Sequence, residues 1–361
     1  MDHSVPTPHP ETLPSVPPKQ GGGSRTPTTC QSVLESRPFE QIDPDTYFTM
    51  NPTPPHLSGN EALIEEFVQH HQFRTSCPVV LITSGGTIVP LENQTVRFID
   101  NFSAGTRGAA SAEYFIAQGY AVIFMHRERS LQPFARHFGP VTLTSQSTRG
   151  TLLDYLMVDP DTREVKVKPD YQADMYQAVS RYQKALQERR LLMVTFTTLS
   201  DYLFLLRSAT RCLSTLGPRA MCYLAAAVSD FFIPAQKMVE HKIQSADGGL
   251  TLTMDQVPKF LRPLVYEWAP RSFIVSFKLE TDPKLLIPKA KHALTRYGHQ
   301  VVIGNLLTSR KRTVTFITPE HDFVIHLSEE ECLQNPDLEI EAKIVAQLTE
   351  LHRAFIDTTE K

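Results

Sequence analysis

The sequence has 361 residues, a formal net charge of -3 at pH 7 and 41% hydrophobic residues. This charge gives no general attraction to nucleic acid, and no run of about 18 apolar residues indicates a membrane span. The first residues lack a secretion signal, and the five cysteines show neither metal-ligand nor disulfide-framework spacing. We therefore expect an intracellular protein, in the cytoplasm or also the nucleus, that binds neither nucleic acid nor membrane.

Residues 1–58 differ in composition from the rest of the chain. They hold 12 of the 27 prolines, and such a segment buries too little apolar surface to offset the entropy of ordering. We expect a proline-rich, largely disordered leader over residues 1–58, of which 39–50 can dock as an arm. Residues 59–361 are then expected to form one α/β domain. The proline spacing leaves open a role in binding a partner domain.

From residue 60 onward, apolar strands alternate with helical patterns. The predicted helices cover residues 60–71, 108–118, 171–189, 199–215, 258–268, 284–297 and 338–356. The predicted strands cover residues 79–83, 121–125, 192–197, 222–228, 273–277 and 301–303. This alternation predicts a Rossmann-like α/β fold, with a mostly parallel sheet and helices on both of its faces.

Three segments break the alternation. The short alternating runs 242–244 and 250–254 flank Asp247-Gly248-Gly249, which predicts a β-hairpin flap. The runs 314–317 and 323–327 predict a second hairpin before the last helix. Residues 145–170 are polar, and we expect a long surface loop or an insertion there.

Two glycine-containing segments predict a site for an anion. Ser84-Gly85-Gly86-Thr87 ends the first strand, and the stretch from Arg97 to Gly108 leads into the next helix. Glycines let a backbone approach a phosphate, and the N–H groups at the start of a helix favour negative charge. A nucleotide or a phosphorylated substrate is therefore expected.

The position of this site follows from the predicted sheet. In open α/β sheets, ligands bind beyond the carboxyl ends of the strands, which adds residues 225–230, 277–280 and 304–305 to the expected site. The first turn lacks Gly-x-Gly-x-x-Gly, and the sequence has no Gly-Lys-Ser/Thr. These absences disfavour a nicotinamide-dependent reductase and a Walker-type phosphate loop.

Five segments, taken together, resemble the eukaryotic phosphopantothenate–cysteine ligases, also called phosphopantothenoylcysteine synthetases. They are residues 84–87, 97–105, 225–231, 241–245 and 277–281. They occur in the family's order, and the resemblance extends over about residues 60–356. Bacterial counterparts carry a flavin decarboxylase domain in front, whereas only the proline-rich leader precedes the synthetase-like region here. We therefore expect a monofunctional enzyme.

The resemblance implies a ligation in coenzyme A biosynthesis. ATP adenylates the carboxylate of 4′-phosphopantothenate and releases pyrophosphate, and the amino group of L-cysteine then displaces AMP to form the amide. It also implies an obligate homodimer with dimerisation elements added to the fold. The segment at 277–280 follows the eukaryotic pattern and favours ATP over the CTP that bacterial enzymes use. Mg²⁺ is expected to bridge the phosphates, and no protein metal ligand can be named.

The resemblance assigns roles to individual residues. Asn101 and Lys242 are the expected catalytic residues: Asn101 stabilises the acyl-adenylate, and Lys242 reaches the nucleotide phosphates. The expected substrate-binding residues are Arg97, which acts in the neighbouring subunit's site, and Ala226, Ala227 and Asp230. The expected nucleotide-binding residues are Gly85, Ser103, Gly105, Gly108, Phe277 and Asn305.

Each assignment has a structural alternative. Asn101 could bond its own turn backbone, Lys242 could be a solvated lysine, and Asp230 could cap a turn before Pro234. The alanines and Phe277 could be ordinary core residues. A non-catalytic regulatory subunit of the same fold also stays open, although the presence of both Asn101 and Lys242 argues against it. No residue can be assigned as the base for the cysteine amine.

Overall fold

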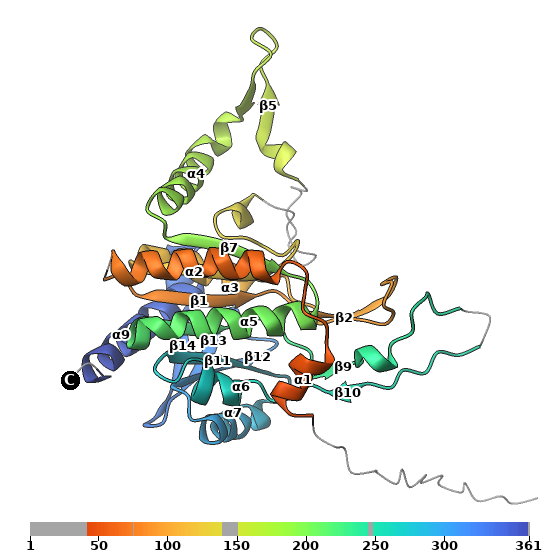
Figure 1. Ribbon diagram of the computed structural model, residues 1–361. Coiled ribbons are helices and arrows are strands. Elements are labelled where there is room, and N and C mark those ends of the chain that lie inside the picture. Colours follow the sequence, from red (N-terminus) through yellow and green to blue (C-terminus); the bar gives the residue numbers. More distant parts are fainter. Residues whose placement is uncertain (1–41, 75, 139–150, 245–247, 360–361) are drawn as a thin grey trace, which may run out of the picture. The chain divides into compact units, whose positions relative to one another are not determined.

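The computed structural model describes residues 42–74, 76–138, 151–244 and 248–359. Its centre is an eight-stranded sheet with the order β14-β13-β12-β11-β8-β1-β4-β7 (Figure 1). The strands are β1 (Val79–Ser84), β4 (Ala121–Arg127), β7 (Leu191–Phe196), β8 (Ala220–Leu224), β11 (Phe273–Glu280), β12 (Val301–Leu306), β13 (Thr313–Ile317) and β14 (Asp322–His326).

The strands from β7 to β12 pair in parallel. Numbered along the chain, they have the Rossmann order 3-2-1-4-5-6, which reverses between β1 and β8. The predicted terminal hairpin is confirmed as the antiparallel strands β13 and β14, which extend the sheet at the β12 edge. The mostly parallel α/β fold is therefore confirmed, and β1 and β8 mark the place where such sheets bind ligands.

Helices cover both faces of the sheet, so alternate strand residues are buried on opposite sides. Leu81 of β1 packs in the core that contains α2 (Leu57–Phe73) and α5 (Leu199–Leu213). Ile82 packs in the other core, which contains α3 (Thr106–Ala117) and α9 (Ile340–Thr359). The remaining helices are α4 (Gln172–Gln187), α6 (Leu261–Pro263) with a π-helical turn (Leu264–Trp268), α7 (Pro283–Tyr297) and α8 (Glu329–Gln334).

The folded domain begins before the predicted boundary at residue 58. Helix α1 (Pro44–Met50) is capped by the Asp43 carboxylate, which accepts from two backbone N–H groups. Tyr47 and Phe48 are buried, and both rings contact Phe260. Residues 44–50 thus dock on the domain, as considered for the arm 39–50, and a prolyl residue at the first helical position favours α1. The predicted boundary at residue 58 falls inside α2. Residues 1–41 lie outside the described residues.

The predicted β-hairpin flap contains a strand pair, but the paired residues differ from those expected. The antiparallel strands are β9 (Phe231–Phe232) and β10 (Asp255–Gln256), whereas 242–244 and 250–254 contain no strand. Leu250 and Leu252 are exposed, so their alternation does not bury a face. Residues 245–247 of the predicted turn lie outside the described residues. The prediction located the projecting segment but placed its pairing wrongly.

Two further two-stranded sheets occur outside the central sheet. The region predicted as a loop contains a short helix (Leu152–Tyr155) and the pair β5 (Leu156–Val158) and β6 (Val165–Val167). The alternative of a surface loop is therefore wrong for 152–158 and 165–167, whereas an insertion between β4 and β7 agrees with this separate pair. Residues 145–150 lie outside the described residues. The second pair is β2 (Ile88–Pro90) and β3 (Phe98–Asp100). Residues 98–100 of the expected glycine loop thus form a strand of a hairpin, and Asn101 directly follows that strand.

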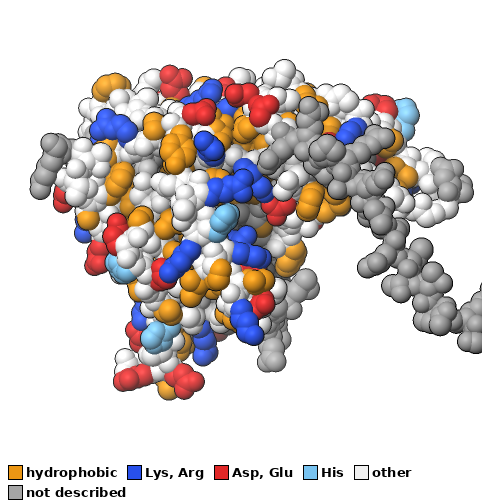
Figure 2. Space-filling view, turned by 90° about the horizontal axis from the view of Figure 1, so that it is seen from below, with side chains coloured by type: hydrophobic (Ala, Val, Ile, Leu, Met, Phe, Trp, Pro, Cys, Tyr) orange, Lys and Arg blue, Asp and Glu red, His pale blue; other side chains and the backbone are white. Residues whose placement is uncertain are grey.

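The surface mixes charges of both signs. On the face seen in Figure 2, lysine and arginine side chains are interspersed with acidic and hydrophobic ones. No helix in the described part of the chain is both long enough and apolar enough to cross a membrane.

Candidate active site

The turn after β1 lies against the start of α3. Gly105 has φ of +82°, a backbone conformation that favours glycine, and precedes the first residue of α3. A Cβ on Gly108 would lie 2.5 Å from the Cβ of Ser84, so only glycine allows this approach. The Ser84 hydroxyl donates to the Gly105 carbonyl at 3.0 Å. The N-terminal N–H groups of α3 thus lie beside the end of β1, where they can bind an anion.

The Asn101 backbone is held against the same turn. Its N–H donates to the Thr87 carbonyl at 3.1 Å, and its carbonyl carbon would lie 2.8 Å from a Cβ on Gly86. Within the described residues, its carboxamide makes no hydrogen bond. The alternative of a turn asparagine bonded to its own backbone is therefore not observed. The amide is free to bind a ligand from a fixed backbone position.

The segment after β8 is joined to the turn after β1. The N–H of Ala227 donates to the Gly85 carbonyl at 2.8 Å, and the Ala227 carbonyl accepts from the Thr87 N–H at 3.0 Å. The Ala226 N–H donates to the Thr83 hydroxyl at 3.2 Å. These bonds occupy both alanine N–H groups and the Ala227 carbonyl, which leaves the Ala226 carbonyl and the two methyl groups for a ligand.

Asp230 lies at the open end of this segment. Its carboxylate is 3.6 Å from the Lys259 ammonium, and its side chain is 77% exposed. Its carbonyl, rather than its carboxylate, accepts from Val257. The predicted alternative of a carboxylate capping the turn before Pro234 is not seen among the described contacts, so the carboxylate is available to a ligand.

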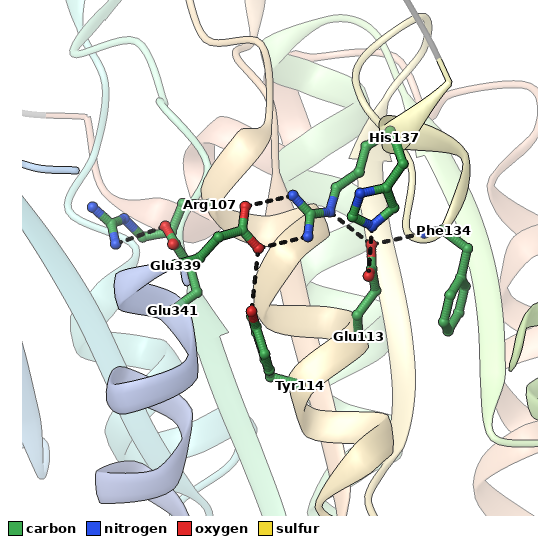
Figure 3. A network of polar contacts seen from close by, with 8 residues as sticks. Arg107, Glu113, Tyr114, Phe134, His137, Glu339 and Glu341 are labelled. Carbon is green, nitrogen blue, oxygen red and sulfur yellow. Dashed lines mark hydrogen bonds and ion pairs between the residues drawn. The ribbon is translucent and has the colours of Figure 1, made fainter. Parts of the chain in front are cut away.

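A pocket of about 300 Å³ opens at the carboxyl ends of β8 and β11. Three of the predicted site residues line it, namely Ala226, Asp230 and Phe277, together with Lys259 and Ser276. A larger cavity of about 560 Å³ lies beside the Glu113 network of Figure 3 and contains none of the predicted residues. The smaller pocket is therefore the candidate for the substrate arm.

Phe277 and Asn305 lie on adjacent strands of the same sheet edge. The Phe277 ring packs edge-on against Tyr223, with centroids 4.9 Å apart. The Asn305 side chain is buried, and its Oδ1 accepts from the Arg107 guanidinium at 3.3 Å. The predictions omitted Arg107, although a cation between Gly105 and Gly108 at the start of a helix was a visible signal.

Arg97 and the Lys242 segment meet within one chain. The Arg97 guanidinium is 2.9 Å from the buried Glu92 carboxylate and donates to the Ile243 carbonyl at 3.1 Å. Backbone hydrogen bonds from Asn93 to the Val239 carbonyl join the same two segments. Hydrogen bonds from the Arg97 backbone N–H and side chain lower the pKa of Glu92, which favours its charged form.

Lys242 is exposed, and its ammonium has no hydrogen bond or ion pair to another described residue. A free ammonium on a projecting segment is the property that the phosphate-binding role requires. Ser103 lies just before α3, where its hydroxyl accepts a 3.4 Å hydrogen bond from the Gly105 N–H. The structure thus gathers the turn residues, Ser103, Asn101 and the alanines around the β1–β8 position.

Residues 77–205 and 206–351 match the family described as the DNA/pantothenate metabolism flavoprotein C-terminal domain. The human phosphopantothenate–cysteine ligase is 50% identical over 279 residues, which cover 77% of this chain and 87% of the human protein. The chain belongs to the phosphopantothenate–cysteine ligase family. The resemblance predicted from five short segments is confirmed.

Two further comparisons agree with this family. The Saccharomyces cerevisiae phosphopantothenate–cysteine ligase CAB2 is 45% identical over 297 residues, or 77% of this chain and 78% of CAB2. A solved structure of a Cab2 mutant in complex with phosphopantothenate-cysteine has a TM-score of 0.79 and 42% identity. It covers 88% of this chain and 100% of that chain. Members of the family are ligases, so the prediction of an enzyme is confirmed.

Proposed function

We propose that the chain joins 4′-phosphopantothenate to L-cysteine through an acyl-adenylate formed from ATP. The product is 4′-phosphopantothenoylcysteine, an intermediate of coenzyme A biosynthesis. The observation that carries this proposal is the free carboxamide of Asn101. It stands on a fixed backbone beside the β1–β8 position, next to the start of α3.

The proposed reaction has two steps, adenylation of the carboxylate and amide formation. A carboxylate oxygen of phosphopantothenate attacks the α-phosphorus of ATP, and the bond to the leaving pyrophosphate breaks. The cysteine amine then attacks the acyl carbon, and the bond to the AMP oxygen breaks as the amide forms and a proton is lost. Each step develops negative charge on oxygen, which fixed hydrogen-bond donors stabilise most in the transition state.

The chain's residues suit these charges. The Asn101 NH₂ donates to the acyl oxygen, and the Lys242 ammonium approaches the phosphates of ATP from the projecting segment. The turn residues Gly85, Ser103, Gly105 and Gly108 accommodate phosphate at the start of α3. No group of three or more His, Cys, Asp or Glu residues in the described ranges forms a metal site. Mg²⁺, where bound, would neutralise charge on the phosphates of ATP, and it can do so through phosphate and water without a protein-built site.

The surface around the β2–β3 hairpin supports the proposed homodimer. Val96, Phe98 and Phe102 are large apolar side chains that lie exposed around Arg97, and such a patch favours a protein interface. A second copy packed there would carry Arg97 to its neighbour's substrate.

This arrangement predicts complementation between two inactive variants. Arg97→Ala mixed and refolded with Asn101→Ala forms hybrid dimers in which one site has both residues and the other has neither. Activity in trans restores about a quarter of the wild-type rate, since about half of the dimers are hybrids. If both residues act within one chain, the mixture stays inactive.

Product analysis tests the proposed reaction itself. Purified protein with ATP, Mg²⁺, L-cysteine and 4′-phosphopantothenate is expected to release AMP and pyrophosphate. ADP and phosphate would instead indicate an acyl-phosphate route. The same assay with CTP in place of ATP tests the nucleotide preference, and faster turnover with CTP would overturn it.

A further inference from the structure

Arg107 joins four parts of the fold through one guanidinium. It is the second residue of α3, and its side chain is only 15% exposed. Its Nη1 is 2.9 Å from Glu341 Oε1 on α9, and its Nη2 donates to the Arg310 carbonyl at 2.7 Å. The same Nη2 donates to Asn305 Oδ1 on β12, and the guanidinium carbon lies 5.9 Å from the centroid of the Phe277 ring on β11.

This contact fixes the orientation of the Asn305 carboxamide. A guanidinium can only donate hydrogen bonds, so the group facing Arg107 must be the amide oxygen. The Asn305 NH₂ then faces the Ile303 carbonyl at 3.4 Å. Both bonds are long, and without Arg107 little else among the described residues holds the amide in this orientation. The cation therefore sets which group Asn305 presents to a ligand.

Arg107 is itself held by a buried acid. Glu341 is 8% exposed, and its carboxylate is paired with Arg107 at the start of α9 (Figure 3). Burial raises the pKa of Glu341, and the charge of Arg107 opposes that rise. A buried pair of this kind keeps both groups in one geometry, because separating them leaves an uncompensated charge.

We propose that Arg107 is a positioning residue for the nucleoside triphosphate, acting through Asn305 and Phe277. This inference rests on the proposed function, which assigns those two residues to ATP. Arg107 holds the Asn305 amide in one orientation and restricts the Phe277 ring from one side. Its loss leaves both residues present but no longer aligned for the nucleotide.

The chain provides a matched control in Arg136. Like Arg107, Arg136 is paired with acidic residues. Its guanidinium is 2.7 Å from the carboxylate of Glu113 on α3 and 2.6 Å from that of Glu339, just before α9. Figure 3 shows the Glu113 cluster and the Arg107–Glu341 pair on opposite sides of Tyr114. Arg136 contacts neither Asn305 nor Phe277 among the described residues. Removing it breaks a comparable buried network without touching the proposed nucleotide residues.

The test is the dissociation constant of ATP, measured by isothermal titration calorimetry with Mg²⁺ and without the other substrates. Arg107→Met is expected to weaken ATP binding about 10-fold, the effect of one lost charge-assisted hydrogen bond. Arg107→Lys keeps the charge but loses the planar fork, and it is expected to weaken binding as well. Arg136→Met is expected to change the constant by less than about 2-fold, since its lost contacts lie elsewhere.

Two further variants separate positioning from folding. The double variant with R107M and E341Q removes the buried unpaired charge, and it is expected to fold well while still binding ATP weakly. Adding R107M to N305A is expected to weaken binding less than R107M alone does, because the route through Asn305 is already lost and only the restraint on Phe277 remains.

The outcomes separate this inference from the proposed function. Wild-type ATP affinity in R107M, equal weakening in R136M, or additive effects with N305A would each overturn the role of Arg107 while leaving the proposed reaction intact. A wild-type protein that binds no ATP would overturn the proposed function, and the inference with it.

Discussion

Asn101→Ala is expected to lower kcat about 10²–10³-fold, the usual effect of removing one donor to a developing oxyanion. The loss should fall on amide formation, because the carboxamide stabilises the acyl carbon's oxygen as cysteine attacks. Rapid-quench experiments with labelled ATP should therefore show pyrophosphate released in a first turnover, followed by slow release of AMP. The fold is expected to persist, since the Asn101 backbone carries the contacts to Thr87 and Gly86.

Asn93→Ala is the matched control for this variant. Asn93 lies at the other end of the same hairpin, where its NH₂ donates to the Glu240 carboxylate at 2.9 Å. We expect a kcat within about 2-fold of wild type, because the lost bond is on the surface. Unchanged turnover in Asn101→Ala, or an equal loss in both variants, would remove Asn101 from its role.

Lys242→Gln is expected to slow the activation half-reaction about 100-fold. Its ammonium has no described partner, so the charge is available to the phosphates, and a bond to a charged group contributes up to about 3 kcal/mol. Pyrophosphate release in the first turnover should slow, while transfer from preformed acyl-adenylate to cysteine stays near the wild-type rate. Stability should be unchanged, since Lys242 is exposed and makes no described side-chain contact.

Lys237→Gln is the control on the same projecting segment. Lys237 is paired with Asp255 at 2.8 Å, at the base of the segment. Its loss removes one positive charge from the same region and should leave activation almost unaffected, because the pair is exposed. If Lys242→Gln impaired only the transfer step, its assignment to the phosphates would be wrong.

The central sheet was predictable because its strands are buried on both faces. All six residues of β1 are buried, and a parallel strand covered on both sides reads as an unbroken apolar run. Residues 39–50 were considered as an arm that docks on the domain, but the proline-rich composition did not predict that Pro44 begins a helix. The Tyr47 and Phe48 side chains of that helix pack in the core.

The alternation of apolar and polar residues predicted a strand wrongly where the structure provides no strand to pair with it. The run 250–254 alternates like a strand, but pairing needs a partner, and the structure provides one only for Asp255 and Gln256. The strand propensity of a segment carries no information about its pairing partner. The pairing of β9 with β10 therefore could not be predicted from the local sequence.

The candidate site residues came from sequence motifs, whereas the long-range contacts that hold them could not be predicted. The turn residues, Asn101 and the alanines were all in recognisable segments, and the sheet order brings them to the β1–β8 position. Arg107 depends on contacts to residues about 200 positions away, Asn305 and Glu341. No local pattern reports a contact of that range. The same limit applies to the Arg97 bond to Ile243, which joins two segments that are 146 residues apart in the sequence.

Oxygen-isotope tracing tests the proposed adenylation most directly. In the assay, 4′-phosphopantothenate carries ¹⁸O in its carboxylate, and the AMP formed is analysed by mass spectrometry. Attack on the α-phosphorus followed by displacement at carbon transfers one carboxylate oxygen to AMP, so AMP with one ¹⁸O is expected. Unlabelled nucleotide together with ¹⁸O in inorganic phosphate would contradict it.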